Sequence, residues 1–103
     1  MSKLNPVILA VRAGISEKME GEFNEWYNHV HIPEVLNCPG WITARRYEAI
    51  EGGPKYLAIY ELEGNEARQT KEFLRVRGWS KFESYITDQV ATIYRQIYPT
   101  ITE

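Results

Sequence analysis

Hydrophobic residues recur along the chain with two periods, one typical of strands and one typical of helices. The run VILAV over Val7–Val11 is apolar at every position, as in a strand that is buried on both faces. After Ser16, which can act as an N-cap, apolar side chains follow a helical stripe at Met19, Phe23, Trp26, Tyr27 and Val30. This stripe predicts a helix to about His31, and Pro33 predicts that the helix kinks or stops there.

The rest of the chain predicts a hairpin, a second helix and a last strand. Glu51-Gly52-Gly53-Pro54 has the composition of a hairpin turn between two apolar runs. The expected elements are strands at Trp41–Ile50 and Lys55–Leu62, a helix at Asn65–Val76, a helical piece at Trp79–Ile86 and a strand at Ile93–Ile101.

The predicted order is β-α-β-β-α-β, which is the ferredoxin-like arrangement. In this α+β fold an antiparallel sheet carries its helices on one face, and residues 1–103 form a single domain. The first and third strands are apolar on both sides, whereas the helices can cover only one of them. We therefore expect a homodimer through the bare sheet face.

The hairpin indicates which residues face the helices. If its strands are symmetric about Gly52 and Gly53, Arg45 lies opposite Tyr60 and Tyr47 lies opposite Ala58. One face then carries an aromatic and polar set that resembles a pocket wall, namely Trp41, Thr43, Arg45, Tyr47, Tyr56 and Tyr60. A slip of one residue would exchange Arg45 for Arg46 on this face.

Composition and charge exclude several classes of protein. At 103 residues and 12.0 kDa the chain suffices for one core but not for a separate cofactor-binding domain. Twelve basic against fourteen acidic residues leave a net charge of −2 without a basic stripe, which argues against nucleic acid or a membrane as partner. No apolar run is long enough to span a membrane, and the lone Cys38 fits a cytoplasmic protein without disulfides. Motifs of serine hydrolases, NTPases, dinucleotide-binding proteins and thiol oxidoreductases are missing.

Both histidines lie at the end of the predicted first helix. At about 100° per residue, His29 and His31 fall on opposite flanks of the apolar stripe, so they cannot ligate one metal ion and no metal site is predicted. His31 follows Tyr27 by four residues on the same flank, which makes the two side chains neighbours. A neutral imidazole beside a phenol suits acid–base chemistry near pH 7. The structural alternative is a histidine that caps the helix end or binds a backbone carbonyl.

These residues also carry a family resemblance. The stretch EFNEWYNHVHIPEVLNCPGWITARRYEA, followed by KYLAIYELEG, resembles the EthD-like proteins of the dimeric α+β barrel superfamily. The likeness covers essentially the whole chain and rests on Trp26-Tyr27, His31-Ile32-Pro33-Glu34 and Pro39-Gly40 together. It implies a ferredoxin-like fold, a homodimer and a pocket between helices and sheet. Relatives of this fold include polyketide cyclases, methylmuconolactone isomerase, cofactor-independent quinol monooxygenases and haem-degrading enzymes, so the fold alone does not define the reaction.

The first functional hypothesis is a small enzyme without a cofactor. It would carry out lyase, isomerase or cyclase chemistry on an aromatic, polyketide-like or lactone intermediate. His31 would transfer the proton, with Tyr27 and Tyr60 as its hydrogen-bonding partners. Arg45 would anchor a carboxylate or enolate. The residues expected to bind substrate are Trp26, Arg45, Tyr47 and Trp41.

Two alternatives use the same pocket. One is a carrier that binds a small molecule without turning it over. The other is a monooxygenase, either cofactor-independent or haem-dependent with His31 as the axial ligand.

Overall fold

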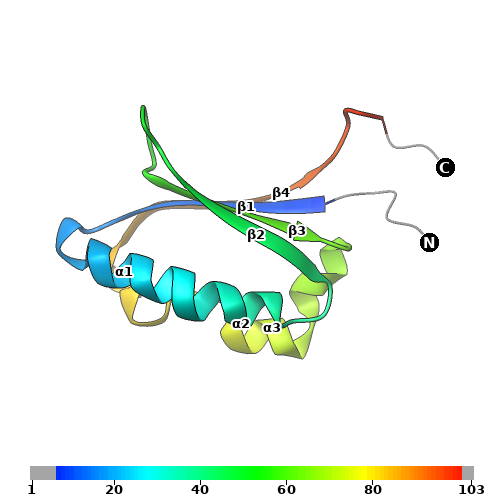
Figure 1. Cartoon of the computed structure of the whole chain (residues 1–103), viewed down its shortest axis with the longest axis horizontal. Helices are drawn as coiled ribbons and strands as arrows, with labels where there is room; N and C mark the ends of the chain where they lie inside the picture. Colours follow the sequence, from blue (N-terminus) through cyan, green and yellow to red (C-terminus); the bar gives the residue numbers. More distant parts are fainter. Residues whose placement is uncertain (1–6, 101–103) are drawn as a thin grey trace.

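Four antiparallel strands form one sheet in the computed structural model, which describes residues 7–100. Strand β1 (Val7–Ile15) lies between β3 (Tyr56–Leu62) and β4 (Ile86–Arg95), and β2 (Trp41–Glu48) pairs with the other edge of β3. All helices of the described residues pack on one face of the sheet (Figure 1). The strand order β2-β3-β1-β4 confirms the predicted ferredoxin-like α+β fold.

Of the two outcomes predicted at Pro33, a kink or a stop, the stop does not occur, because the first helical arm continues past this residue to Leu36. It consists of η1 (Glu17–Met19), α1 (Glu20–Trp26), η2 (Tyr27–His31) and α2 (Ile32–Leu36). Pro33 lacks an N–H group, and its ring crowds the carbonyl four residues earlier, at His29. The wider π-helical turn of η2 contains that carbonyl and relieves the crowding, while Ile32 keeps helical dihedral angles of −62° and −46°.

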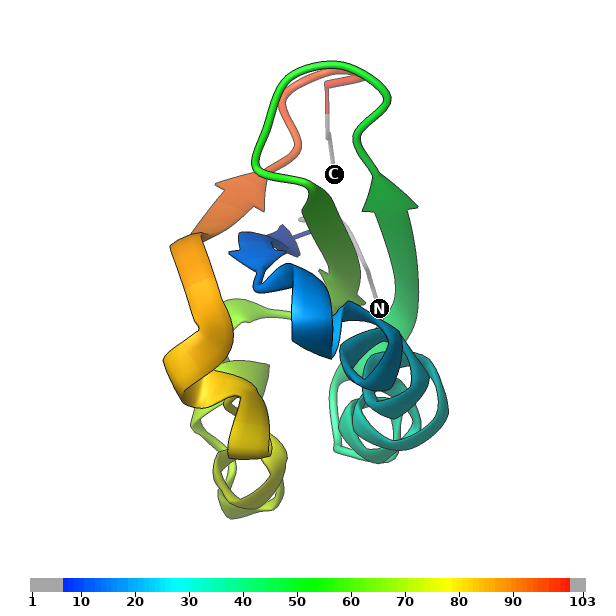
Figure 2. The same cartoon turned by 90° about the vertical axis from the view of Figure 1, so that its left-hand side faces the viewer.

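The second helical arm lies beside the first on the same face of the sheet (Figure 2). It consists of η3 (Asn65–Gln69), α3 (Lys71–Val76) and η4 (Ser80–Tyr85). The predicted single helix breaks at Thr70, whose backbone is extended and whose Oγ1 accepts a hydrogen bond of 3.1 Å from the N–H of Phe73. This N-cap starts α3 in a new direction.

The last strand begins earlier than expected. β4 starts at Ile86, where a helical piece was predicted, and not at Ile93; the predicted strand end at Ile101 lies outside the described residues. Polar residues at the start of β4 hide the strand pattern, because this edge strand pairs only with β1 and is largely exposed. Asp88 has a positive φ of 53°, near the point where the β1–β4 register is irregular.

The hairpin register differs by one residue from the symmetric pairing. Arg45 lies opposite Ile59 and not Tyr60, and Tyr47 lies opposite Leu57 and not Ala58. Arg46 takes the position opposite Ala58, on the helix-covered face. An irregularity between Trp41 and Thr43 leaves Trp41 on this buried face while Thr43, Arg45 and Tyr47 point to the open face. The one-residue shift that exchanges Arg45 for Arg46 on the covered face is therefore present in the structure.

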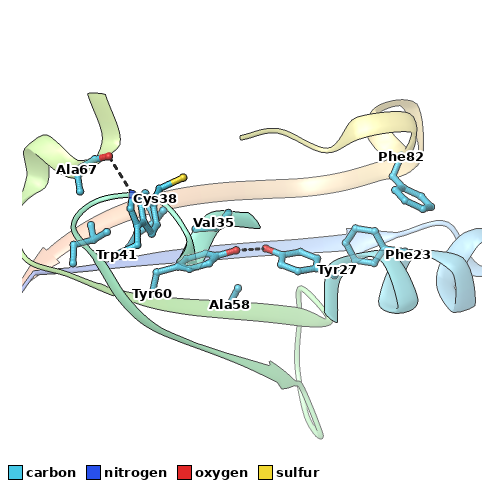
Figure 3. Close-up of a cluster of buried hydrophobic side chains, with 11 residues drawn as sticks. Phe23, Tyr27, Val35, Cys38, Trp41, Ala58, Tyr60, Ala67 and Phe82 are labelled. Atoms are coloured by element: carbon cyan, nitrogen blue, oxygen red, sulfur yellow. Dashed lines mark hydrogen bonds between the residues drawn. The ribbon is translucent and has the colours of Figure 1, made fainter. Parts of the chain in front are cut away.

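Aromatic contacts lie at both ends of the core, one between the two helical arms and one between the sheet and the second arm; Figure 3 shows Phe23 and Phe82 at the first end and Trp41 at the second. At one end Phe23 meets Phe82 edge to face, with ring centroids 5.4 Å apart. At the other end Trp41 stacks on Phe73 at 4.4 Å, and its indole N–H donates to the carbonyl of Ala67 at 3.1 Å. Edge-to-face and stacked rings of this kind stabilise a core beyond their buried area.

Gly40 occupies a position that no other residue fits. Its φ is +86°, and an added Cβ would lie 2.8 Å from the Cβ of Ala67. Gly40→Ala should therefore lower the free energy of unfolding by about 2 kcal/mol, as measured in urea. Gly21→Ala is the matched control and should raise it by about 1 kcal/mol, because Gly21 lies in α1 with no atom within 4 Å of the added Cβ. Equal effects of the two changes would contradict this account.

Candidate functional site

A cavity of about 290 Å³ lies between the sheet and the two helical arms. This volume is at the lower end of the range for small-molecule sites, about 300 to 1,000 Å³. Every layer of the fold contributes to its wall, which consists of Leu9, Val11, Tyr27, His31, Val35, Trp41, Tyr60, Arg68, Phe73, Arg77, Gly78, Trp79, Gln89 and Ala91. Most of these side chains are apolar or aromatic, so the cavity suits a ligand of one or two rings.

The structure brings together part of the set of site residues predicted from the sequence. Tyr27, His31, Trp41 and Tyr60 line the cavity. Trp26 does not reach the wall but stacks on the His31 ring, with centroids 4.7 Å apart and planes 18° apart.

Arg45 and Tyr47 lie away from the cavity, because the one-residue shift turns both to the open face of the sheet. The sequence analysis missed three polar residues of the wall, Arg68, Arg77 and Gln89. They come from η3, from the end of α3 and from the polar start of β4. Each lies where the expected elements were least accurate, and no motif marks them.

Two tyrosines join the first helical arm to the sheet inside the cavity. The hydroxyls of Tyr27 and Tyr60 are 3.1 Å apart and form one hydrogen bond, in which either can be the donor (Figure 3). Burial raises the pKa of both phenols, so both keep their protons at neutral pH. Two O–H groups that share one bond leave one proton for a further acceptor. The pair can therefore donate a hydrogen bond to an oxygen atom in the cavity.

His31 is a buried, neutral imidazole. Its side chain is only 6% exposed, and burial lowers its pKa from 6.5 to about 4. Trp26 covers one face of the ring and Tyr27 meets it edge-on at 5.2 Å. Its Nδ1 atom is buried without a hydrogen-bond partner among residues 7–100, which is costly in a native core. The ring is therefore an uncharged group that can accept a proton from a bound molecule.

Arg46 supports Tyr27 from the side opposite the cavity wall. Its guanidinium lies 4.2 Å from the Tyr27 ring centroid and 5.1 Å from that of Tyr56. Nη1 donates to Oδ1 of Asn28 at 2.9 Å, while Nε and Nη2 are buried without partners in the described part of the chain. The nearby charge favours a phenolate at Tyr27, although burial outweighs it and keeps the pKa raised. Arg46 thus adjusts the acidity of the tyrosine pair without touching the cavity.

The remaining ionisable groups do not form a metal or thiolate centre. No cluster of three or more His, Cys, Asp or Glu residues within the described range could hold a metal ion. Cys38 is buried, and desolvation raises the pKa of its thiol, so it remains protonated. A separate polar network of Glu20, Asn24, Lys55 and Tyr56 ties α1 to the hairpin and does not line the cavity.

The structure is thus that of a ferredoxin-like α+β protein with a ligand-sized cavity between its sheet and its helical arms. The chain belongs to the family described as a domain of unknown function, DUF4286, whose model matches residues 6–98. None of the curated proteins matches the sequence.

Solved structures with a similar fold share little sequence with this chain. A Nitrosomonas europaea protein, provisionally described as an antibiotic biosynthesis monooxygenase, has 15% identity and a TM-score of 0.65 over 97% of both chains. The heme-degrader MhuD from Mycobacterium tuberculosis has 14% identity and a TM-score of 0.68, with 88% of this chain and 95% of that one covered. An ethyl tert-butyl ether degradation (EthD) family protein from Bacillus halodurans has 15% identity and a TM-score of 0.65, covering 90% and 99%. These similarities concern the fold alone. In addition, no helix among residues 7–100 has the length and apolar character of a membrane span.

Burial of His31 makes stability depend on pH. Between pH 6.5 and about 4 the unfolded chain takes up a proton on His31 that the folded chain does not. The free energy of unfolding should therefore be highest above pH 6.5 and should decrease as the pH falls. His31 contributes about 3 kcal/mol in total to this decrease. Urea unfolding across this range should show a smaller pH dependence in His31→Gln than in the native protein, whereas His29→Gln should retain the native slope. The same slope in native protein and His31→Gln would contradict the assignment.

Proposed function

We propose that the cavity is the active site of a small enzyme that transfers a proton on a phenolic or enolisable molecule of one or two rings. The observation that carries this proposal is the buried Tyr27–Tyr60 hydroxyl pair beside the neutral His31 in an apolar cavity. This arrangement supplies a proton acceptor and a hydrogen-bond donor within one cavity. It falls in the lyase, isomerase or cyclase range and needs no metal ion.

The proposed reaction has two parts, which are removal of a proton from the substrate and stabilisation of the negative charge that this leaves. A C–H or O–H bond of the substrate breaks, its proton moves to the His31 imidazole, and its electron pair remains on the substrate as an enolate or phenolate. The tyrosine pair donates a hydrogen bond to that oxygen, which is stronger in an apolar cavity than in water. The imidazolium and the new anion stabilise each other, which offsets the low pKa of the free histidine. Return of the proton to another atom completes an isomerisation.

A cofactor-independent monooxygenase is the second candidate. Its support is the fold shared with the Nitrosomonas europaea protein, whose provisional description is a monooxygenase. The same proton removal would form the electron-rich enolate or phenolate that dioxygen can oxidise. The two candidates differ in whether dioxygen is consumed, so oxygen uptake during turnover separates them.

Haem fits this cavity poorly. MhuD is a heme-degrader of the same fold, with two hemes bound in its active site. In this chain the cavity of about 290 Å³, at the lower end of the range for small-molecule sites, accommodates one or two rings more readily than a macrocycle of four pyrrole rings. No step of the proposed reaction uses haem.

We also propose that the chain is related to the EthD-like proteins. This relationship is supported by the shared fold of the Bacillus halodurans protein and by the Trp26-Tyr27 and His31-Ile32-Pro33-Glu34 motifs. In this structure the motifs have a physical role, since Trp26 and Tyr27 enclose the His31 ring.

Hydrogen–deuterium exchange tests the proton transfer without knowledge of the natural substrate. In D₂O the native protein should accelerate exchange of the α C–H of neutral cyclic ketones with one or two rings, such as 2-tetralone, followed by NMR. His31→Gln should lose this acceleration by at least about 100-fold, because general-base catalysis contributes that much or more. His29→Gln is the matched control and should keep the native rate, since His29 is exposed and away from the cavity.

Binding separates the enzyme from a carrier. Quenching of tryptophan fluorescence by the same ketones should persist in His31→Gln if this residue acts in chemistry. Binding by the native protein without accelerated exchange across the series would support the carrier and contradict the proposed enzyme.

We also propose that two copies of the chain pair through the open sheet face. No described helix or strand covers this face, which bears half-buried Leu57 and Ile59 and the exposed side chains of Val90 and Tyr94. Exposed apolar area of this kind is unfavourable in water and is commonly buried between subunits. A second copy offers the same face, and an isologous pair would bury both.

Charge on this face should prevent pairing. Val90→Lys should convert the dimer to a monomer in sedimentation experiments and remove the dependence of the melting temperature on protein concentration. Val30→Lys is the matched control, because Val30 is 44% exposed, similar to 51% for Val90, but lies in the helical layer. A native protein that sediments as a folded monomer at micromolar concentration would contradict the proposal.

A further inference from the structure

The wall of the cavity contains two arginines that the proposed proton transfer does not use. Arg68 belongs to η3 and Arg77 directly follows α3. Arg77 is exposed and Arg68 is half-buried, so both reach the solvent side of the wall. Neither arginine takes part in a salt bridge with another described residue. Arg68 Nη1 donates only to the neutral Oδ1 of Asn65, at 3.0 Å. The rim thus carries positive charge that the described residues leave unpaired.

The backbone holds both arginines in place. Arg68 follows the buried Ala67, whose carbonyl accepts the indole N–H of Trp41. The N–H of Arg77 donates to the carbonyl of Phe73 at 3.0 Å and closes the end of α3. Both side chains therefore extend from fixed backbone positions beside the cavity.

The other polar groups of the cavity are uncharged. The Tyr27–Tyr60 pair keeps its protons, and His31 is neutral and only 6% exposed. An anionic group is costly at this buried end and favourable beside the two guanidinium groups. The cavity is therefore polarised, with cations at its rim and neutral hydrogen-bonding groups in its interior.

We infer that the ligand is an aromatic or conjugated carboxylate of one or two rings. Its carboxylate binds Arg68 and Arg77 at the rim, and a phenol or carbonyl oxygen at its other end accepts a hydrogen bond from the tyrosine pair. Guanidinium groups recognise planar carboxylates through paired hydrogen bonds, which favours a carboxylate over a neutral group at this position. The rings occupy the apolar space between Leu9, Val11 and Phe73. This inference rests on the proposed function, since it names the substrate class for the same cavity.

Two matched probes test it by titration of the tryptophan fluorescence. The first, 6-hydroxy-2-naphthoate, carries both groups, and 2-naphthol lacks the carboxylate. The native protein should bind the naphthoate at least tenfold more tightly, and the preference should shrink as salt is added. Arg68→Gln combined with Arg77→Gln should remove the preference and leave 2-naphthol affinity unchanged. Arg77→Lys in an otherwise native chain should retain part of the preference for the naphthoate.

Arg75→Gln provides the control for charge alone. Arg75 is an exposed residue of α3 that does not line the cavity, so its loss should leave the preference intact. Equal affinity for the two probes, failure to bind either, or an unchanged preference in the double variant would overturn the inference. A preference that depends on the arginines without any deuterium exchange would overturn the proposed enzyme and leave the ligand class standing. Exchange on the neutral ketones without a preference for the carboxylate would support the proposed enzyme and overturn the ligand class.

Discussion

The hydrogen bond between Tyr27 and Tyr60 is the contact on which the rest of the site depends. It joins the first helical arm to the middle of the sheet, and each hydroxyl would otherwise be buried without a partner. Tyr27 and His31 are the first and last residues of the π-helical turn η2, and both are buried. The turn that accommodates Pro33 therefore contains both the histidine and one member of the tyrosine pair. Local widening of a helix of this kind is common at functional sites.

The charges near this unit are separated by the aromatic rings. Arg46 lies against the Tyr27 ring on one side, and the neutral interior of the cavity lies on the other. The ring transmits part of the field of Arg46 while it excludes the guanidinium from the cavity. As a result, the hydroxyl pair feels a positive charge but no ion pair forms within the site. This separation keeps the interior apolar and keeps every potential proton donor and acceptor uncharged at neutral pH.

The fold can be predicted well from the sequence because it follows from the spacing of hydrophobic residues along the chain. The apolar stripe of the first helix, the Gly-Pro turn and the runs of β1 and β3 lead to the ferredoxin-like order, and the spacing of Tyr27 and His31 places them together. The register of the hairpin could not be predicted, since the irregularity near Ile42 changes which of two adjacent arginines is covered. Arg68, Arg77 and Gln89 were missed for a different reason. They lie in short or polar elements whose position depends on tertiary contacts, so no local pattern marks them.

The location of the cavity follows from the sizes of the side chains around it. Phe23 and Phe82 fill the space between the arms at one end of the core (Figure 3), and Trp41 of the sheet packs on Phe73 of the second arm at the other. Between these clusters the sheet presents smaller residues to the cavity, among them Val11 and Ala91. Rigid rings at both ends prevent the arms from closing onto this part of the sheet, because aromatic side chains cannot be compressed and have few alternative rotamers. The remaining space is the cavity, and its wall contains the polar residues that neither cluster uses. The aromatic residues that stabilise the fold are thus the same residues that keep the site open.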